Sequence, residues 1–171
     1  MIFMFRRPIS LFCLFAGTLL CAACSYSLGA HGKLPFSTVV VAPIKNMTEL
    51  TQTQATLATD VADALDAEPG LKTVVYGGNA RLEIVVADVK RSVSLTNSRD
   101  TGVASTQTLT VKFSCSLLDA RTGKYYFRDR AVSVSAETYM GGQTGLLETQ
   151  AFPQISRDAA RKIRDLVVGV W

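Results

Sequence analysis

Histidine is nearly absent from this chain, which removes the commonest side chain for acid–base catalysis and metal binding. The one histidine, His31, lies in a glycine-containing linker over residues 25–37, where no sequence signal ties it to a nucleophile or a metal. Carboxylates are present, but Asp60, Asp63 and Asp66 recur every three residues along one expected helix, which is typical of a solvated stripe. We therefore expect a protein that is not an enzyme and that holds no metal or cofactor.

Cysteines are few and cannot pair in the mature chain. Cys13 and Cys21 lie inside the amino-terminal apolar run, Cys24 follows that run directly, and Cys115 stands alone. If the residues before Cys24 are removed and Cys24 carries lipid, no intramolecular disulfide is available. Cys115 occupies an apolar position of an expected strand, which favours a buried and inert thiol over a nucleophile.

No apolar run is long enough to span a bilayer comfortably, and the amino-terminal one is typical of an export signal. The pair Arg6-Arg7 supplies a positive start, and residues 9–23 are apolar apart from one serine and one threonine. The junction Ala22-Ala23-Cys24 resembles the bacterial lipobox, with Cys21 where that motif usually has leucine. We expect cleavage before Cys24 and a covalent lipid on it; the alternative is an ordinary secretory signal cut near Ala23.

Positive charge is not concentrated in the mature chain. Removal of the signal leaves 148 of the 171 residues and lowers the formal net charge from +4 to +2. That length suits one domain with its own core, and the charge balance predicts no nucleic-acid partner. We divide the chain into a lipoprotein signal peptide at 1–23, a lipidated amino terminus and linker at 24–37, and a single α/β domain at 38–171.

Hydrophobic periodicity predicts a domain of the order βαβββα. A β-branched run at 38–42 predicts a buried strand, and apolar residues at helical spacing predict a helix to Leu65 that begins at a Thr51–Gln54 capping box. A strand at 71–76 would complete a parallel βαβ unit. Longer strands follow at 82–95, 109–117 and 125–139, and an amphipathic helix ends the chain at 155–170. The fold class is α+β, a two-layer sandwich whose mixed four- to five-stranded sheet has two helices packed on one face.

Two turns are expected between these elements. Asn46 and Thr48 are turn residues after the first strand. Residues 119–124 contain Thr-Gly-Lys, but the spacing of a phosphate-binding loop is absent. We therefore interpret this segment as a hairpin turn.

Two irregularities are expected within the regular elements. In the strand at 125–139, the apolar residues change midway from odd-numbered to even-numbered positions. One extra residue near Asp129 to Ala131 would cause this change, so we predict a β-bulge there. Pro153 lies inside the final helical pattern. It either opens that helix or kinks a longer one that begins near Leu146.

Several stretches resemble the LptE family of lipoproteins. Mature LptE chains characteristically begin Cys-Gly-Tyr-x-Leu, and this chain has Cys24-Ser25-Tyr26-Ser27-Leu28, with serine in place of glycine. The likeness continues through Leu34-Pro35, Asn46-Met47-Thr48, the segment 80–84 and the hairpin at 118–124, so it covers nearly all of the mature chain. Strand-Asn-x-Thr-helix beginnings also occur in TolB-like and curli-secretion lipoprotein domains. Another periplasm-facing lipoprotein adaptor of a secretion or envelope complex is therefore the alternative.

The LptE resemblance implies a role without catalysis. It implies a lipoprotein on the periplasmic side of the outer membrane that plugs the LptD β-barrel and helps it to assemble and to insert lipopolysaccharide. The Ser/Thr-rich surface from Ser92 to Thr110 suits a hydrated contact with the polar wall of a barrel.

Lipopolysaccharide would need cations, because Arg and Lys make charge-assisted hydrogen bonds to phosphate groups. Basic residues on the long strands and their connections are the candidates for this contact. They are Lys90, Arg91, Arg99, Lys112, Arg128 and Arg130. The alternative interpretation is that such residues only keep a sheet edge or face soluble.

Overall fold

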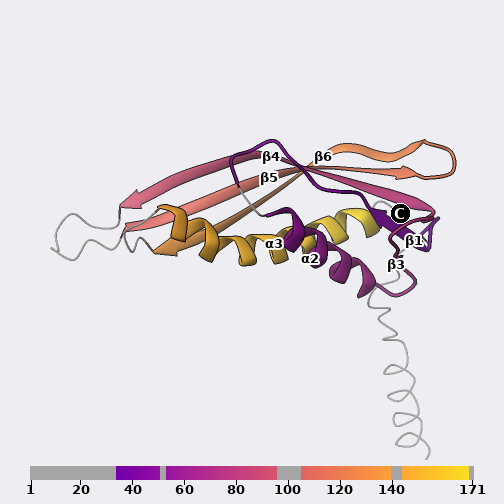
Figure 1. Ribbon diagram of the computed structural model, residues 1–171, viewed down its shortest axis with the longest axis horizontal. Helices are drawn as coiled ribbons and strands as arrows, with labels where there is room; N and C mark the ends of the chain where they lie inside the picture. The colour runs from indigo at the N-terminus through magenta and orange to yellow at the C-terminus, as the bar shows by residue number, and fades with distance from the viewer. Residues whose placement is uncertain (1–33, 51–52, 96–104, 140–143, 170–171) are drawn as a thin grey trace, which may run out of the picture. The chain divides into compact units, whose positions relative to one another are not determined.

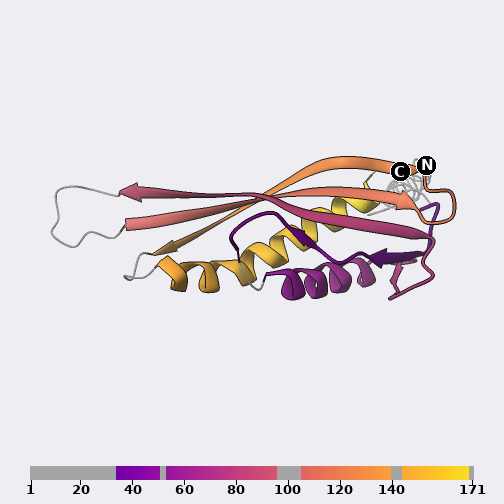
Figure 2. The same cartoon turned by 45° about the horizontal axis from the view of Figure 1, so that its top comes forward.

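A six-stranded sheet forms one layer of the domain, and two helices form the other (Figure 1). The computed structural model describes residues 34–50, 53–95, 105–139 and 144–169. The elements, in chain order, are β1 Thr38–Val41, β2 Lys45–Asn46, α2 Gln54–Asp66, β3 Lys72–Thr73, β4 Ala80–Leu95, β5 Ser105–Asp119, β6 Tyr125–Tyr139 and α3 Thr144–Val168. Both helices lie on the same face of the sheet (Figure 2). The predicted α+β two-layer fold is confirmed.

The sheet combines a small parallel part with a long antiparallel part. Its order is β3-β1-β4-β5-β6, and β2 pairs separately with β4. The strand β1 is parallel to both β3 and β4, which confirms the parallel βαβ unit around α2. The strands β4, β5 and β6 form an antiparallel meander of 15 or 16 residues each.

Buried and more exposed residues alternate along β5, and the buried ones mark the face of the sheet that the helices cover. Every second residue from Leu109 to Leu117 is buried, and the residues between them are mostly more exposed. The apolar faces of the two helices complete the core. Their buried members include Leu57, Val61, Leu65, Ile155, Ala159, Ile163 and Val167. Full burial of a side chain such as Leu or Ile stabilises the fold by about 1.5–3 kcal/mol, so this contact is the main source of stability.

One short strand changes the predicted strand count. We expected four to five strands and found six, because β2 adds Lys45–Asn46 beside Val85 and Val86 of β4. Asn46 still forms the expected turn, since its Oδ1 accepts from the Thr48 backbone N–H at 2.8 Å. A two-residue strand leaves no periodic signal in the sequence.

The expected strand at 71–76 is also shorter in the structure. Only Lys72 and Thr73 form β3, and the chain then leaves the sheet toward β4. Gly77 has φ 74°, a left-handed conformation that favours glycine and turns the chain. The β-branched residues that suggested a strand here therefore lie partly in a loop.

The folded domain begins earlier than expected. Phe36 lies in the segment that we assigned to the linker, yet only 3 % of its surface is exposed. Its ring centroid is 5.4 Å from that of Tyr126 on β6. An isolated aromatic residue next to proline has no periodicity, so the sequence pattern could not show that it is part of the core.

Both helices differ in detail from the expected bounds. The helix α2 begins at Gln54, after Thr53, and the Thr51 half of the expected capping box lies outside the described residues. The helix α3 runs through Pro153 from Thr144, so the longer of the two alternatives is confirmed.

The predicted bulge in the last strand is confirmed. The register passes from the pair Cys115–Arg130 to the pair Leu117–Phe127, so Arg128 and Asp129 together oppose Ser116. Asp129 has φ 50°, and its backbone N–H donates to Ser116 Oγ at 2.9 Å. A second irregularity at Ala87 of β4, between Val86 and Asp88, was not predicted.

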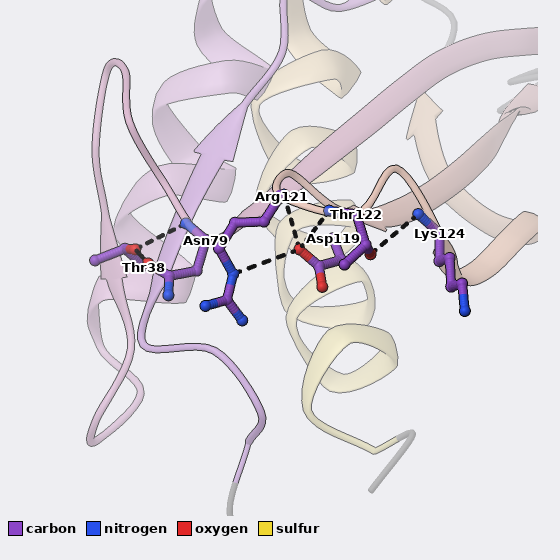
Figure 3. Close-up of polar contacts among 6 residues, drawn as sticks. All are labelled: Thr38, Asn79, Asp119, Arg121, Thr122 and Lys124. Carbon is purple, nitrogen blue, oxygen red and sulfur yellow. Dashed lines mark hydrogen bonds and ion pairs between the residues drawn. The ribbon is translucent and has the colours of Figure 1, made fainter.

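The hairpin turn at 119–124 is held by one carboxylate (Figure 3). Asp119 Oδ1 accepts from the backbone N–H of Arg121 at 2.8 Å and of Thr122 at 3.3 Å. The Ala120 backbone N–H donates to the Asn79 carbonyl at 2.9 Å, and Asn79 in turn bonds to Thr38 on β1. The hydrogen bond from the Arg121 backbone is the main reason that the pKa of Asp119 is below its ordinary value.

Replacing Asp119 with alanine should therefore destabilise the domain in a pH-dependent way. A pKa that is lower in the folded than in the unfolded state stabilises the fold above the unfolded value of about 3.9, and the effect is lost as pH falls through the folded value. We expect Asp119→Ala to lower Tm at pH 7 and the difference from wild type to narrow below about pH 4. Thermal unfolding at several pH values measures this, with exposed Glu49→Ala as control. A difference that stays constant down to pH 3 would contradict the account.

Candidate functional site

Hydroxyl side chains line the face of β4, β5 and β6 that faces away from the two helices. The register aligns cross-strand rows on this face, among them Lys90 with Thr110 and Ser135, and Asp88 with Lys112 and Ser133. Each of these side chains is exposed or half-buried. We call this surface the hydroxyl face and define it by Lys90, Ser92, Thr108, Thr110, Lys112, Ser114, Ser133 and Ser135.

The polar groups of the hydroxyl face make few contacts with one another. Thr110 Oγ1 and Ser135 Oγ are 2.8 Å apart and share a hydrogen bond. Lys112 Nζ is 3.8 Å from Asp88 Oδ2, and both side chains are nearly half exposed. An exposed ion pair of this kind contributes only about 0–1 kcal/mol. Most of the hydrogen-bonding capacity of this face is therefore directed toward solvent or a partner.

Two of the five candidate cations that the structure describes share the hydroxyl face, and one residue of β5, Val111, lies between their rows. Lys90 and Lys112 project from adjacent strands, and Lys112 is partly paired with Asp88. Arg91 belongs to the other face by register, because it lies opposite buried Leu109.

The remaining candidates are not close to this pair. Arg128 lies in the β6 bulge, where its Nε is 3.4 Å from Asp129 Oδ2 and its guanidinium is 5.1 Å from the centre of the Tyr125 ring. Arg130 pairs in register with Cys115. Of the candidates within the described residues, only Lys90 and Lys112 therefore lie together on the hydroxyl face. Arg99 and the expected lipidation site, Cys24, lie outside the described residues.

A second polar surface lies between the two helices. A groove of about 690 Å³ is lined by charged residues of α2 and α3, including Asp60, Asp63 and Arg157. The buried Ser156 hydroxyl donates to Asp60 Oδ2 at 2.5 Å, and Arg157 Nε donates to the Pro153 carbonyl at 3.0 Å. These contacts join the helices or close locally within α3, so the groove is best explained as a helix–helix contact.

The described part of the chain offers no metal site and no long apolar helix. Within residues 34–50, 53–95, 105–139 and 144–169, no group of three His, Cys, Asp or Glu residues is placed to hold a metal ion. Over the same ranges, no helix combines the length and the apolar character needed to cross a membrane.

Sequence reasoning missed a contact at the outer edge of the sheet. Lys162, on the wet side of α3, donates from Nζ to the Ser133 carbonyl of β6 at 2.8 Å. A lysine that is hydrogen-bonded to a backbone carbonyl of an edge strand hinders the pairing of another strand with that edge. Only the packing of α3 beside β6 brings these residues together, so no local sequence signal could have shown it.

The sequence matches no protein-family model and no curated protein, whereas the fold has solved relatives. An uncharacterised lipoprotein B from Nitrosomonas europaea has a TM-score of 0.51 and 18 % identity, over 80 % of this chain and 84 % of that one. A DUF330 protein from Xanthomonas campestris also has a TM-score of 0.51, with 9 % identity over 79 % and 85 % of the two chains. A minor lipoprotein from Acinetobacter baumannii has a TM-score of 0.47 and 16 % identity, over 78 % and 94 %. At these identities the two matches with a TM-score of 0.51 show a shared fold, and one of them is a lipoprotein.

Cys115 should be unreactive in the folded protein. Its side chain is fully buried, and burial raises the pKa of the thiol to about 12, so almost no thiolate forms at pH 8. We expect iodoacetamide to leave Cys115 unmodified in the native protein and to alkylate it in guanidinium chloride, as measured by peptide mass spectrometry. Alkylation of the native protein at the rate of the denatured one would contradict this interpretation.

Proposed function

We propose that this protein is a non-enzymatic lipoprotein, anchored by Cys24 on the periplasmic side of the outer membrane, that plugs an LptD-type β-barrel and assists lipopolysaccharide insertion. The hydroxyl face is the observation that carries the proposal. It is a long, polar and helix-free surface, and no metal or cofactor is needed for the role.

The strands that carry the hydroxyl face are long enough to lie along the inside of a barrel. Strands of 15 residues extend about 50 Å, compared with about 30 Å for the hydrocarbon core of a bilayer. The interior of an outer-membrane barrel is polar, and hydroxyl groups can exchange hydrogen bonds with such a wall directly or through water. The helices lie on the opposite side of the sheet, so they would not obstruct this contact.

The amino-terminal signal and the fold support the anchored part of the proposal. The junction at Cys24 resembles a lipobox, and lipoproteins are among the solved structures that the domain resembles. For lipopolysaccharide, Lys90 and Lys112 are the best placed of the five candidate cations within the described residues, because they project from the same face.

The barrel partner is tested by purification of the full-length protein in mild detergent followed by mass spectrometry. We expect a large outer-membrane β-barrel to copurify, and depletion of the protein to lower surface lipopolysaccharide. Cys24→Ala should lack the lipid mass and lose membrane partition. Absence of any barrel would count against the proposal, and recovery of a secretion channel or cell-wall synthase instead would favour another adaptor role.

To test the contact surface, we compare a glutamate substitution on the sheet with a glutamate substitution on a helix. Thr110→Glu places a carboxylate in the middle of the hydroxyl face, beside Lys90, where the fold can tolerate it. We expect this variant to keep its Tm and to recover much less barrel, because the new charge must be desolvated at the interface. Thr56→Glu is the matched control at an exposed position of α2 and should recover as much barrel as wild type. Equal recovery by both variants would show that the hydroxyl face is not the contact.

A further inference from the structure

The loop between β3 and β4 holds two apolar side chains out in solvent. Val75 is 88 % exposed and Tyr76 is 86 % exposed, the highest values among the large apolar residues described. Gly77 adopts φ 74°, which favours glycine. A Cβ on Gly78 would lie 2.9 Å from Val40 Cγ2 and 3.1 Å from the Val40 backbone nitrogen. Two glycines thus let the loop press against β1 while its tip points outward.

An apolar groove continues from the tip of this loop. It has a volume of about 620 Å³ and lies between α2, the end of β1 and the loop, with Val41, Ala62 and Val75 among its lining residues. It exists because β3 pairs with only Thr38 and Val39, which leaves the edge of β1 beyond them without a strand. Val75 belongs to both surfaces, so the exposed tip and the groove form one apolar patch.

This patch lies beside the point where the chain enters the domain. The Lys72 backbone N–H donates to the Ser37 carbonyl, and the Val74 N–H donates to the Val39 carbonyl, both at 2.9 Å. Nine residues separate Cys24 from Leu34, the first residue described, so ten Cα-to-Cα steps join the two. A chain of that length spans at most about 36 Å. A lipid on Cys24 would therefore keep the patch within reach of the bilayer surface.

We propose that the loop at 74–78 and its groove contact the bilayer in which the Cys24 lipid is inserted. This inference rests on the anchored part of the proposed function and adds a second attachment. Tyrosine is enriched at membrane interfaces, because its ring is apolar and its hydroxyl can remain in water. Lys72 and Asp66 carry opposite charges near the base of the loop, so we expect the contact to depend little on salt.

Fluorescence quenching by lipid tests this contact in the full-length, lipidated protein. Trp171 is the only tryptophan, so Trp171→Phe provides a background without intrinsic emission from that side chain. In vesicles of phosphatidylethanolamine and phosphatidylglycerol, Tyr76→Trp should lose emission when the acyl chains are brominated. Met47→Trp is the matched control, because Met47 is 75 % exposed and lies farther along the sheet, bonded to Val86. Its emission should not change.

The outcomes separate this inference from the rest of the proposed function. Unchanged Tyr76→Trp emission in a protein that carries its lipid would overturn the membrane contact and leave the anchor in place. The double variant Val75→Ser, Tyr76→Ser, purified in detergent and mixed there with the purified barrel, should bind the barrel as well as wild type does, because no bilayer orients the domain under those conditions. Loss of the barrel from this variant would assign the loop to a protein interface instead. A mature protein without lipid mass would overturn the anchor and the membrane contact together.

Discussion

The packing of two helices against one face of the β4–β5–β6 meander is the constraint on which the rest of the structure depends. Alternate residues of β5 from Leu109 to Leu117 are buried under the helices, so the residues between them must face away. Because both helices lie on the same side, the described chain has no second layer over those outward residues. The hydroxyl face is thus a direct consequence of where the core lies. Its polarity is what keeps an uncovered sheet of this length in water.

Features with a local signal could be predicted from the sequence, and features that depend on distant partners could not. The alternation of β5 and the parity change before Val132 both lie within one strand, and both were predicted correctly. The strand β2 exists only because Lys45 and Asn46 meet β4, forty residues away. The same limit applies to the contact between Lys162 and Ser133, which depends on the position of α3.

The candidate cations show how one unpredicted irregularity changes a site. Before Ala87 the even-numbered residues of β4, such as Ile84 and Val86, face the helices. The extra residue at Ala87 reverses this parity, so Lys90 faces away while Arg91 lies opposite buried Leu109. A regular strand would have exchanged the faces of these two cations. Composition could show which residues were basic, but only the register shows which of them can act together.

A plug anchored as we propose must also be oriented so that its hydroxyl face points toward the barrel. A single lipid tether limits the distance between a domain and the membrane but does not fix the domain's orientation. Each wrong orientation lowers the effective concentration of the hydroxyl face at a barrel in the same membrane. A second contact beside the tether, at Val75 and Tyr76, removes most of those orientations. Because β1 joins the base of that loop to β4, the direction of the loop and the direction of the hydroxyl face are set by the same sheet. Tether, loop and hydroxyl face would then act as one device that presents the polar surface to its partner.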